Sequence, residues 1–257
     1  MQKIKDSKKS GAAQTCCPVV ELRQYTLHPG MRDTLIELFD REFVESQEAL
    51  GMKVIGQFRD IDNPNRFVWL RGFRDMPSRA EALKSFYGGP VWKAHGKAAN
   101  VTMIDSDNVL LLRPARPTSG FSLENSERPP PGSSELPKGL IVATIYYFSD
   151  PAAGAGFVDF FERSMKPVLT ESGASILAYF VTENSENTFP ALPVREGERV
   201  FIWFSRFRDQ AAYQDYAAAL ARSSPWSSEV SKGLARRLKG PPEVLRLLST
   251  ARSLVHG

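Results

Sequence analysis

The residues best equipped for chemistry alternate along one predicted strand near the N-terminus. Glu21, Arg23 and Tyr25 are spaced two apart within residues 19–27, whose alternating pattern predicts a β-strand. Because successive side chains of a strand point to opposite faces, these three share one face. Glu21, or His28 in the turn that follows, is a candidate general base. Arg23 is suited to stabilise a developing enolate, and Tyr25 to donate a hydrogen bond. We predict these four as catalytic residues.

The same alternation places further polar and aromatic side chains on that face of the predicted sheets. The predicted ligand-binding residues are Gln57, Trp69, Arg71, Tyr146, Tyr179 and Trp203. Arginine offers a two-pronged donor for an anion or a carbonyl group, and the aromatic rings offer flat apolar walls. His95 is added to this set because it follows Trp92 by three residues on a predicted helix.

The charged pair and the two histidines among these residues also have a structural interpretation. Glu21 and Arg23 are close enough on one strand face to satisfy each other as a buried ion pair. His28 fits an exposed loop residue. His95 fits a hydrogen-bonded core residue, a general base or an axial haem ligand. These alternatives stay open at the level of the sequence.

The elements that must position these residues occur twice. Residues 67–75, FVWLRGFRD, return as residues 201–209, FIWFSRFRD, and the flanking segments recur in the same order. A repeat of about 120–130 residues is the size of one small domain and too long for a solenoid unit. The chain is therefore predicted to be a tandem duplication.

Each copy is predicted to run βαββαβ, the split βαβ order of ferredoxin-like α+β domains. In the first copy we expect strands at 19–27, 53–59, 66–73 and 108–113, with helices between the first two and the last two strands. The second copy has a longer hairpin connection at 182–198, which is either a lid over a site or a neutral insertion. The predicted boundaries are a disordered tail 1–17, domains 18–115 and 139–257, and a Pro/Ser-rich linker 116–138.

A ferredoxin-like sheet has helices on one face only, so two copies can bury their bare faces against each other. This predicts a pseudo-twofold α/β barrel of the dimeric type with helices outside. We expect Val20 and Leu22 to face the helices, which leaves Glu21, Arg23 and Tyr25 in a polar barrel lumen. The alternative is that each copy pairs with a copy from another chain.

Composition excludes several classes of function. The net charge of +4 comes with no recognisable nucleic-acid-binding module, and no apolar run is long enough to span a membrane. The adjacent Cys16 and Cys17 fit two reduced thiols and a cytoplasmic protein. The sequence lacks a Walker loop, a Rossmann glycine fingerprint, paired metal ligands and a serine-hydrolase elbow. No cofactor and no metal is therefore predicted.

The first copy resembles the NIPSNAP family. The resemblance rests on the strand 20–27, VELRQYTL, followed by Pro29-Gly30, and on the closing strand 110–114, LLLRP. It includes Trp69, Arg79 and Trp92, and it continues faintly in the second copy at Tyr146, Trp203 and Trp226. The resemblance implies a dimeric α/β-barrel fold. That superfamily includes cofactor-independent monooxygenases, isomerases, haem-degrading enzymes and proteins with no known chemistry, and family members in animals are associated with protein partners.

Three hypotheses follow. The first is a cavity that binds a small anionic or carbonyl-containing molecule, with isomerisation or oxygenation of a carbon acid as its chemistry. The second is a non-catalytic scaffold or protein-interaction module, and the third is a haem-binding protein. A homo-oligomer is compatible with each of them.

Overall fold

The computed structural model describes residues 15–124 and 126–257. Residues 1–14, most of the predicted N-terminal tail, lie outside the described residues. The prediction is wrong for the end of that tail, because Cys17 is buried in the protein core. Within the described part of the chain, no helix has both the length and the apolar character that a bilayer crossing requires.

The first repeat has the predicted order of strands and helices. Its elements are β1 (Val19–Leu27), α1 (Arg32–Leu38), the π-helical turn η1 (Phe39–Phe43), α2 (Val44–Glu48), β2 (Lys53–Asp60), β3 (Arg66–Phe73), α3 (Met76–Gly88), α4 (Pro90–Asn100) and β4 (Met103–Pro114). Asp75 begins α3 because its carboxylate accepts a hydrogen bond from the Ser78 N–H at 2.7 Å. Pro90 stands in the first turn of α4, where its missing N–H costs nothing.

The second repeat follows the same plan. Its elements are β5 (Leu140–Tyr147), α5 (Pro151–Gly154), α6 (Phe157–Phe160), the π-helical turn η2 (Phe161–Met165), α7 (Lys166–Glu171), β6 (Ser175–Thr182), β7 (Val200–Phe207), α8 (Gln210–Arg222), the π-helical turn η3 (Trp226–Val230), α9 (Ser231–Ala235) and β8 (Glu243–Ser249). Asp209 caps α8 through the Ala212 N–H at 2.8 Å, as Asp75 caps α3. The duplication therefore extends to the helix caps.

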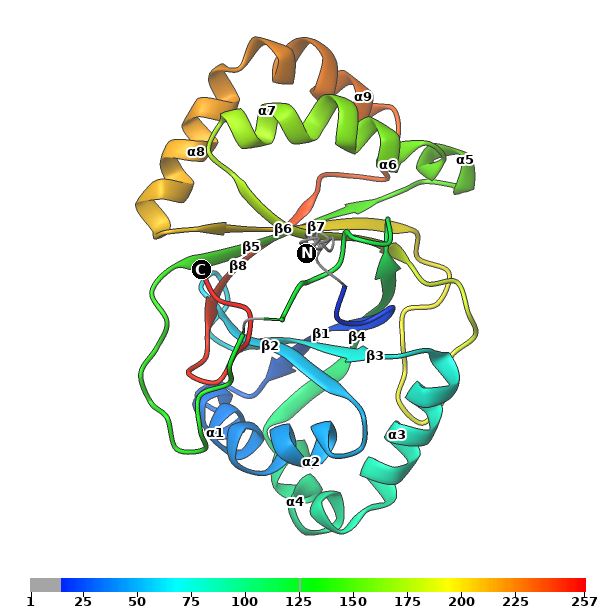
Figure 1. Cartoon of the computed structure of the whole chain (residues 1–257), viewed down its shortest axis with the longest axis vertical. Coiled ribbons are helices and arrows are strands. Elements are labelled where there is room, and N and C mark those ends of the chain that lie inside the picture. Colours follow the sequence, from blue (N-terminus) through cyan, green and yellow to red (C-terminus); the bar gives the residue numbers. More distant parts are fainter. Residues whose placement is uncertain (1–14, 125) are drawn as a thin grey trace, which may run out of the picture.

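The eight strands form one closed barrel in the order β1-β3-β2-β8-β5-β7-β6-β4. The two repeats join where β2 pairs with β8 and β4 pairs with β6, both antiparallel. The barrel thus closes within one chain. Figure 1 shows the two groups of helices on opposite outer sides of the barrel, one group for each repeat. This is the predicted pseudo-twofold α/β barrel.

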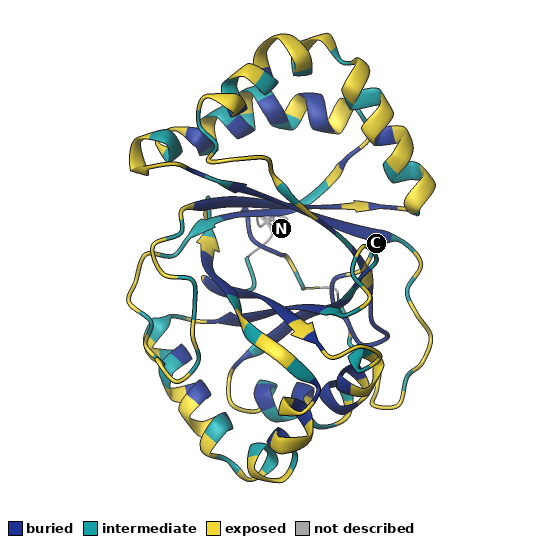
Figure 2. Ribbon diagram, turned by 180° about the vertical axis from the view of Figure 1, so that it is seen from behind, coloured by how far each residue is buried: buried dark blue, intermediate teal, exposed yellow. Residues whose placement is uncertain are grey.

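The interior of the barrel is apolar, and the predicted polar lumen is wrong. Val20 and Leu22 belong there to one buried cluster with residues of the other repeat such as Ile141 and Leu245. Tyr25 and Trp69 belong instead to the cluster between the first sheet and its own helices. Two sheets that meet without water must present apolar faces, because an unpaired polar group there costs several kcal/mol. Figure 2 shows runs of consecutive buried residues along most of the strands, so exposure does not distinguish their two faces.

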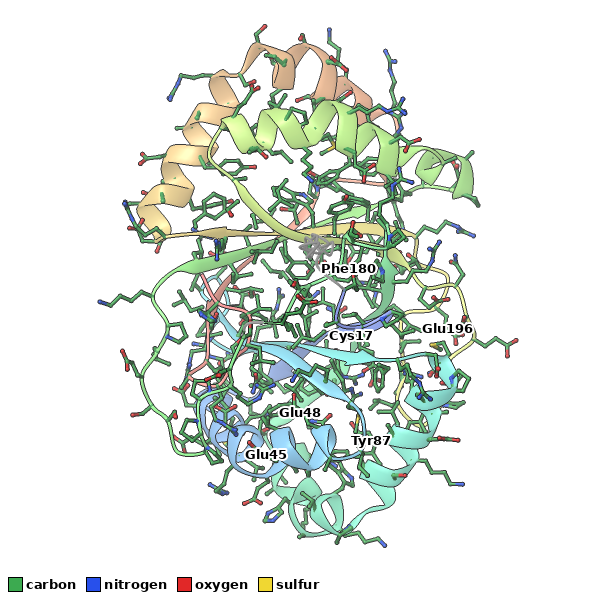
Figure 3. The ribbon with its side chains drawn as sticks, in the orientation of Figure 1. Cys17, Glu45, Glu48, Tyr87, Phe180 and Glu196 are labelled. Carbon is green, nitrogen blue, oxygen red and sulfur yellow. The ribbon has the colours of Figure 1, made fainter. Side chains whose placement is uncertain are left out.

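The connection between the repeats, predicted as a Pro/Ser-rich linker, packs along the barrel. Phe121 enters the same core, with its ring centroid 5.4 Å from that of Phe180. Arg128 donates to a Glu48 carboxylate oxygen at 2.8 Å and so attaches the segment to α2. Figure 3 places Cys17 and Phe180 between the two halves of the barrel. Through these contacts the segment between the repeats becomes part of the folded barrel.

Candidate functional site

The site is built around a buried carboxylate, Glu21, on β1. Arg23 Nη1 lies 2.9 Å from Oε2 of Glu21, and Arg71 Nη2 lies 2.6 Å from the same oxygen. Arg79, on α3, donates through Nε to the other oxygen, Oε1, at 2.7 Å. All four side chains are fully buried. Register explains the meeting, because Glu21 is directly opposite Arg71 in the β1–β3 ladder.

Two further donors of these arginines reach neutral partners. Arg23 Nε donates to the Tyr25 hydroxyl at 2.9 Å, and Arg71 Nη1 donates to the Gln47 side-chain oxygen at 2.9 Å. Neutral acceptors satisfy hydrogen bonds but do not cancel charge.

The cluster therefore carries excess positive charge. Among the described residues, Glu21 is the one carboxylate that forms an ion pair with these arginines. Three positive charges against one negative charge leave two in excess. In addition, the Nη2 atoms of Arg23 and Arg79 are buried and have no hydrogen-bond partner in the described part of the chain. Buried charges persist when they are paired, so the arrangement favours a bound anion.

The charges around Glu21 fix its protonation. Burial alone would raise its pKa, but Arg71, Arg23 and Arg79 together hold the pKa of Glu21 well below its usual range. Glu21 therefore stays ionised and is better suited to hold the arginines than to accept a proton. Burial raises the pKa of Tyr25, although Arg23 opposes the rise, so Tyr25 keeps its proton and can donate it in a hydrogen bond.

An aromatic pocket adjoins this cluster. Tyr25, Gln47 and Trp69 belong to both, and the further lining includes Phe39, Phe43, Phe86, Tyr87, Trp92 and Met103. The guanidinium carbon of Arg71 lies 4.9 Å from the centroid of the Trp69 ring, and that of Arg23 lies 5.7 Å from it. The cavity volume is about 30 Å³, which is room for about one water molecule.

The long hairpin connection of the second repeat, residues 183–199, lies over this site in the first repeat. Asn187 and Thr188 accept hydrogen bonds from Arg79 Nη1 at 2.9 and 3.1 Å. Phe189 stacks on Tyr87, with ring centroids 5.8 Å apart and planes at 19°. Figure 1 shows this segment reaching from the barrel to α3. Of the two alternatives for this insertion, its position matches the lid.

The other predicted site residues lie elsewhere. Gln57 is on the same side of the sheet and donates to Asp40 at 2.9 Å. His28 is exposed in the turn after β1. His95 is 37% exposed on α4, with Nε2 3.4 Å from a Glu42 carboxylate oxygen. The interpretation of His95 as a core residue is therefore wrong, and the aromatic pocket has no room for a haem.

The three predicted residues of the second repeat also face their own helices and not the lumen. The Tyr179 hydroxyl donates to Glu162 at 2.6 Å, near η2. Tyr146 and Trp203 line a cavity between the second sheet and α8. The strand alternation correctly grouped these residues with each other, but it assigned them to the wrong side of the sheet.

Sequence reasoning missed several members of the site. Arg79 was named only within the family resemblance, and its position four residues after the Asp75 cap was the available signal. Gln47 and Tyr87 are on helices whose rotation the sequence did not define. Asn187 and Thr188 come from the other repeat, and no local pattern connects them to Arg79.

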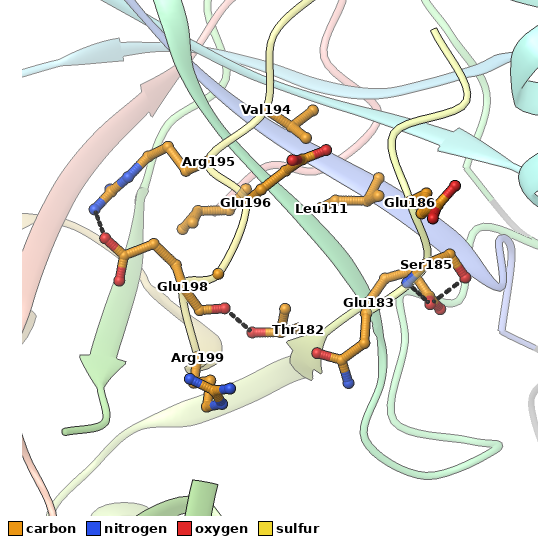
Figure 4. Close-up of a pocket in the computed structure, with 13 residues that line it drawn as sticks. Leu111, Thr182, Glu183, Ser185, Glu186, Val194, Arg195, Glu196, Glu198 and Arg199 are labelled. Carbon is orange, nitrogen blue, oxygen red and sulfur yellow. Dashed lines mark hydrogen bonds and ion pairs between the residues drawn. The ribbon is translucent and has the colours of Figure 1, made fainter. Parts of the chain in front are cut away.

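A separate pocket is formed by the lid hairpin folded over β4 (Figure 4). It measures about 270 Å³, and its lining includes Glu183, Glu186, Glu196 and Glu198. Arg195 pairs with Glu198 at 2.7 Å, and Ser185 pairs with Glu183 at 2.8 Å. Among the described residues, no group of three or more metal-binding side chains converges. Glu183 and Glu198 are therefore bonded within the hairpin, whereas Glu186 and Glu196 are exposed.

Residues 20–117 match the NIPSNAP family model. The first repeat is a NIPSNAP domain. The match covers the strands and helices that hold Glu21, Arg23, Arg71 and Arg79, and it ends shortly after β4. No curated protein sequence matches the chain.

Solved structures share the whole architecture. One is a protein from Lactobacillus acidophilus proposed to be a monooxygenase, with 13% identity and a TM-score of 0.53, over 92% of this chain and 98% of that one. Another is an anthrone oxidase-like protein, also with 13% identity and a TM-score of 0.53, over 93% and 95%. At this identity the likeness shows the fold, a dimeric α/β barrel built from two ferredoxin-like halves.

Proposed function

We propose that the NIPSNAP domain binds a small planar organic anion, such as an aromatic carboxylate or an enolate. The observation that supports this is the two-charge excess of the buried arginines over Glu21. The anionic group would accept hydrogen bonds from the free Nη2 groups of Arg23 and Arg79. The planar body of the ligand would lie against Trp69 and Tyr87.

The present cavity is too small for such a ligand, so binding requires the lid to move. The tip of the lid can separate from the first repeat at low cost, because Phe189 and Thr188 contact it through one ring stack and a few hydrogen bonds. An anion that displaces Asn187 and Thr188 from Arg79 would replace two hydrogen bonds to neutral acceptors with a stronger bond between two charged groups. Ligand binding and lid opening are therefore coupled in this proposal.

The non-catalytic scaffold is the competing hypothesis. The packed barrel lumen and the Glu21–Arg23 pair agree with it. The excess of arginines does not, since a structural pair needs one arginine for one carboxylate. We therefore favour ligand binding.

The proposal is tested by equilibrium dialysis of 2-naphthoate and its uncharged counterpart 2-naphthamide. Arg23→Met removes one positive charge and one free donor while Glu21 keeps Arg71 and Arg79. We expect 2-naphthoate to bind roughly ten- to a hundredfold more weakly, the value of one charge-assisted hydrogen bond. Arg163→Met, at an exposed position in the second repeat, is the matched control.

Two results would contradict the proposal. One is equal binding of 2-naphthoate by the wild type and by Arg23→Met. The other is tighter binding of 2-naphthamide than of 2-naphthoate by the wild type, which would show that charge does not select the ligand.

A second candidate function is oxygenation or isomerisation of a carbon acid at this site. The arginine cluster favours it because buried guanidinium groups stabilise an enolate. Glu21 is not suited to remove the proton, so the substrate must be acidic enough to arrive ionised. Anthrone in alkaline buffer, where an appreciable fraction is ionised, is a suitable probe, and oxygen uptake above the protein-free rate that falls in Arg23→Met supports this function. Uptake equal to the protein-free rate refutes it for this substrate.

A further inference from the structure

The second repeat contains a larger cavity at the position that corresponds to the arginine cluster. It measures about 270 Å³ and lies between strands β5, β7 and β8 and helix α8. Register identifies the equivalent residues. Arg23 is opposite Trp69 in the first repeat, and Thr144 is opposite Trp203 in the second.

Every charge of the first site is replaced in the second. Glu21 and Arg71 face each other across one ladder, and Val142 and Ser205 face each other at the same place in the other. Arg79 follows its helix cap by four residues, as Tyr213 follows Asp209. The aromatic members remain, because Trp203 and Trp226 occupy the places of Trp69 and Trp92. Loss of the large charged side chains leaves the space empty.

The cavity nevertheless keeps polar groups. Trp203 is 3% exposed, and its buried Nε1 lies near the Tyr146 hydroxyl but makes no hydrogen bond of good geometry among the described residues. Tyr146 and Thr144 contribute hydroxyl groups to the lining. Burial raises the pKa of Tyr146 to about 12, so its hydroxyl is neutral and able to donate. An unpaired buried N–H costs about 1–3 kcal/mol, which an acceptor on a ligand would recover.

Size and lining argue against a simple packing defect. Protein interiors pack closely and leave few voids larger than a water molecule, whereas ligand pockets begin at roughly 300 Å³. The cavity also opens to solvent beside Ala217, an exposed residue on α8 that lines it. A ligand can therefore reach the cavity without a movement of the lid.

We infer that the second repeat is a separate binding site for an uncharged, planar aromatic molecule that carries a carbonyl or other hydrogen-bond acceptor. The rings of the ligand would pack between Trp203 and Trp226, and its acceptor would accept a hydrogen bond from the Trp203 N–H. The absence of any charged side chain from the lining selects against ions, since an unpaired ion in such a cavity costs several kcal/mol. The site is independent of the proposed anion site of the first repeat.

The test uses three two-ring compounds in equilibrium dialysis with the full chain: coumarin, naphthalene and coumarin-3-carboxylate. Coumarin is planar, uncharged and has a carbonyl; naphthalene lacks the carbonyl; coumarin-3-carboxylate adds a charge. We expect saturable binding of coumarin that is stronger than that of naphthalene. Any coumarin-3-carboxylate that binds should respond to Arg23→Met and not to changes in the second repeat.

Two variants locate the site. Ala217→Phe fills the cavity and should weaken coumarin binding at least tenfold, while Ala218→Phe, the neighbouring α8 residue outside the lining, should leave it unchanged. Trp203→Phe keeps the ring and removes the N–H. It should reduce coumarin binding by about three- to tenfold, the value of one neutral hydrogen bond, and leave naphthalene binding unchanged.

Three outcomes would overturn the inference: no saturable binding of coumarin, equal binding by Ala217→Phe and Ala218→Phe, or the same loss of coumarin and naphthalene in Trp203→Phe. None of them affects the anion site, whose test depends on Arg23 and 2-naphthoate. Failure of the anion site likewise leaves the coumarin measurements valid.

Discussion

At the scale of single residues, Glu21 holds the first site together. Its two carboxylate oxygens receive hydrogen bonds from three guanidinium groups, which lie on two strands and one helix. Removing the carboxylate would leave three buried positive charges facing one another. The stability of the domain therefore depends on this one negative charge, even though the pair interactions themselves are offset by the cost of desolvation.

We predict that Glu21→Gln lowers the free energy of unfolding by about 3–5 kcal/mol, as expected when one partner of a buried ionic cluster is removed. Urea denaturation measures this directly. Glu171→Gln, at an exposed position at the end of α7, is the control and should change stability little. A loss below 1 kcal/mol in Glu21→Gln would mean that the arginines find other partners.

Asp40 gives a prediction about pH. Burial raises the pKa of Asp40 from 3.8 to about 6. The folded protein then holds a proton that the unfolded chain releases, so this residue makes stability fall as the pH rises from about 4 to 6. Asp40→Asn removes the effect and keeps an acceptor for Gln57. We expect a gain on the order of 1–2 kcal/mol at pH 7 and none at pH 4.

Urea unfolding of both proteins at the two pH values measures the gain. An equal difference at pH 4 and pH 7 would show that Asp40 is ionised throughout. Asp215→Asn, on an exposed part of α8, controls for the type of substitution.

At the scale of elements, the sequence defined the strands and helices well and their rotation poorly. The predicted bounds of the first three strands agree with β1, β2 and β3 to within one residue. The alternation along β1 correctly grouped Glu21 with Arg23 and Tyr25. It could not decide which face met the helices, because both faces of β1 are buried. Periodicity shows which residues share a face of the strand. When both faces are buried, no difference in polarity between them shows which face meets the helices.

The lid hairpin is the element whose mobility the function requires. Phe189→Ala removes the ring stack on Tyr87 and leaves the hydrogen bonds of Asn187 and Thr188. We expect a faster association of 2-naphthoate in stopped-flow fluorescence, by roughly tenfold if the stack contributes about 1 kcal/mol or slightly more. We also expect faster proteolytic cleavage between residues 183 and 199. Unchanged association would show that the hairpin does not limit access.

At the scale of the whole molecule, the shared lumen makes the two repeats one folding unit. Strand pairing across two seams and a common apolar interior connect them. The duplication and the barrel were predictable because repeats and bare sheet faces leave few ways to pack. The lid contact and the packed connection were not, because they join residues about a hundred positions apart.

A cavity in this lumen should therefore destabilise both repeats together. Ile202→Ala removes a fully buried side chain from the barrel interior and is expected to cost about 2–5 kcal/mol. Calorimetry should still show a single unfolding transition. Two separate transitions would mean that the repeats unfold independently. Exposed Val101→Ala is the control, with little expected change.

The two fused copies also differ in the rate at which a ligand could enter and leave each site. The lid reaches from the second repeat to the first, while the corresponding turn of the first repeat, between β2 and β3, spans only residues 61–65. The two sites would therefore exchange their contents at different rates. An anion behind the lid would have a long residence time set by the hairpin, whereas a neutral molecule beside α8 would come and go freely. One chain would then keep an anion bound at the first site while neutral molecules bind and dissociate rapidly at the second.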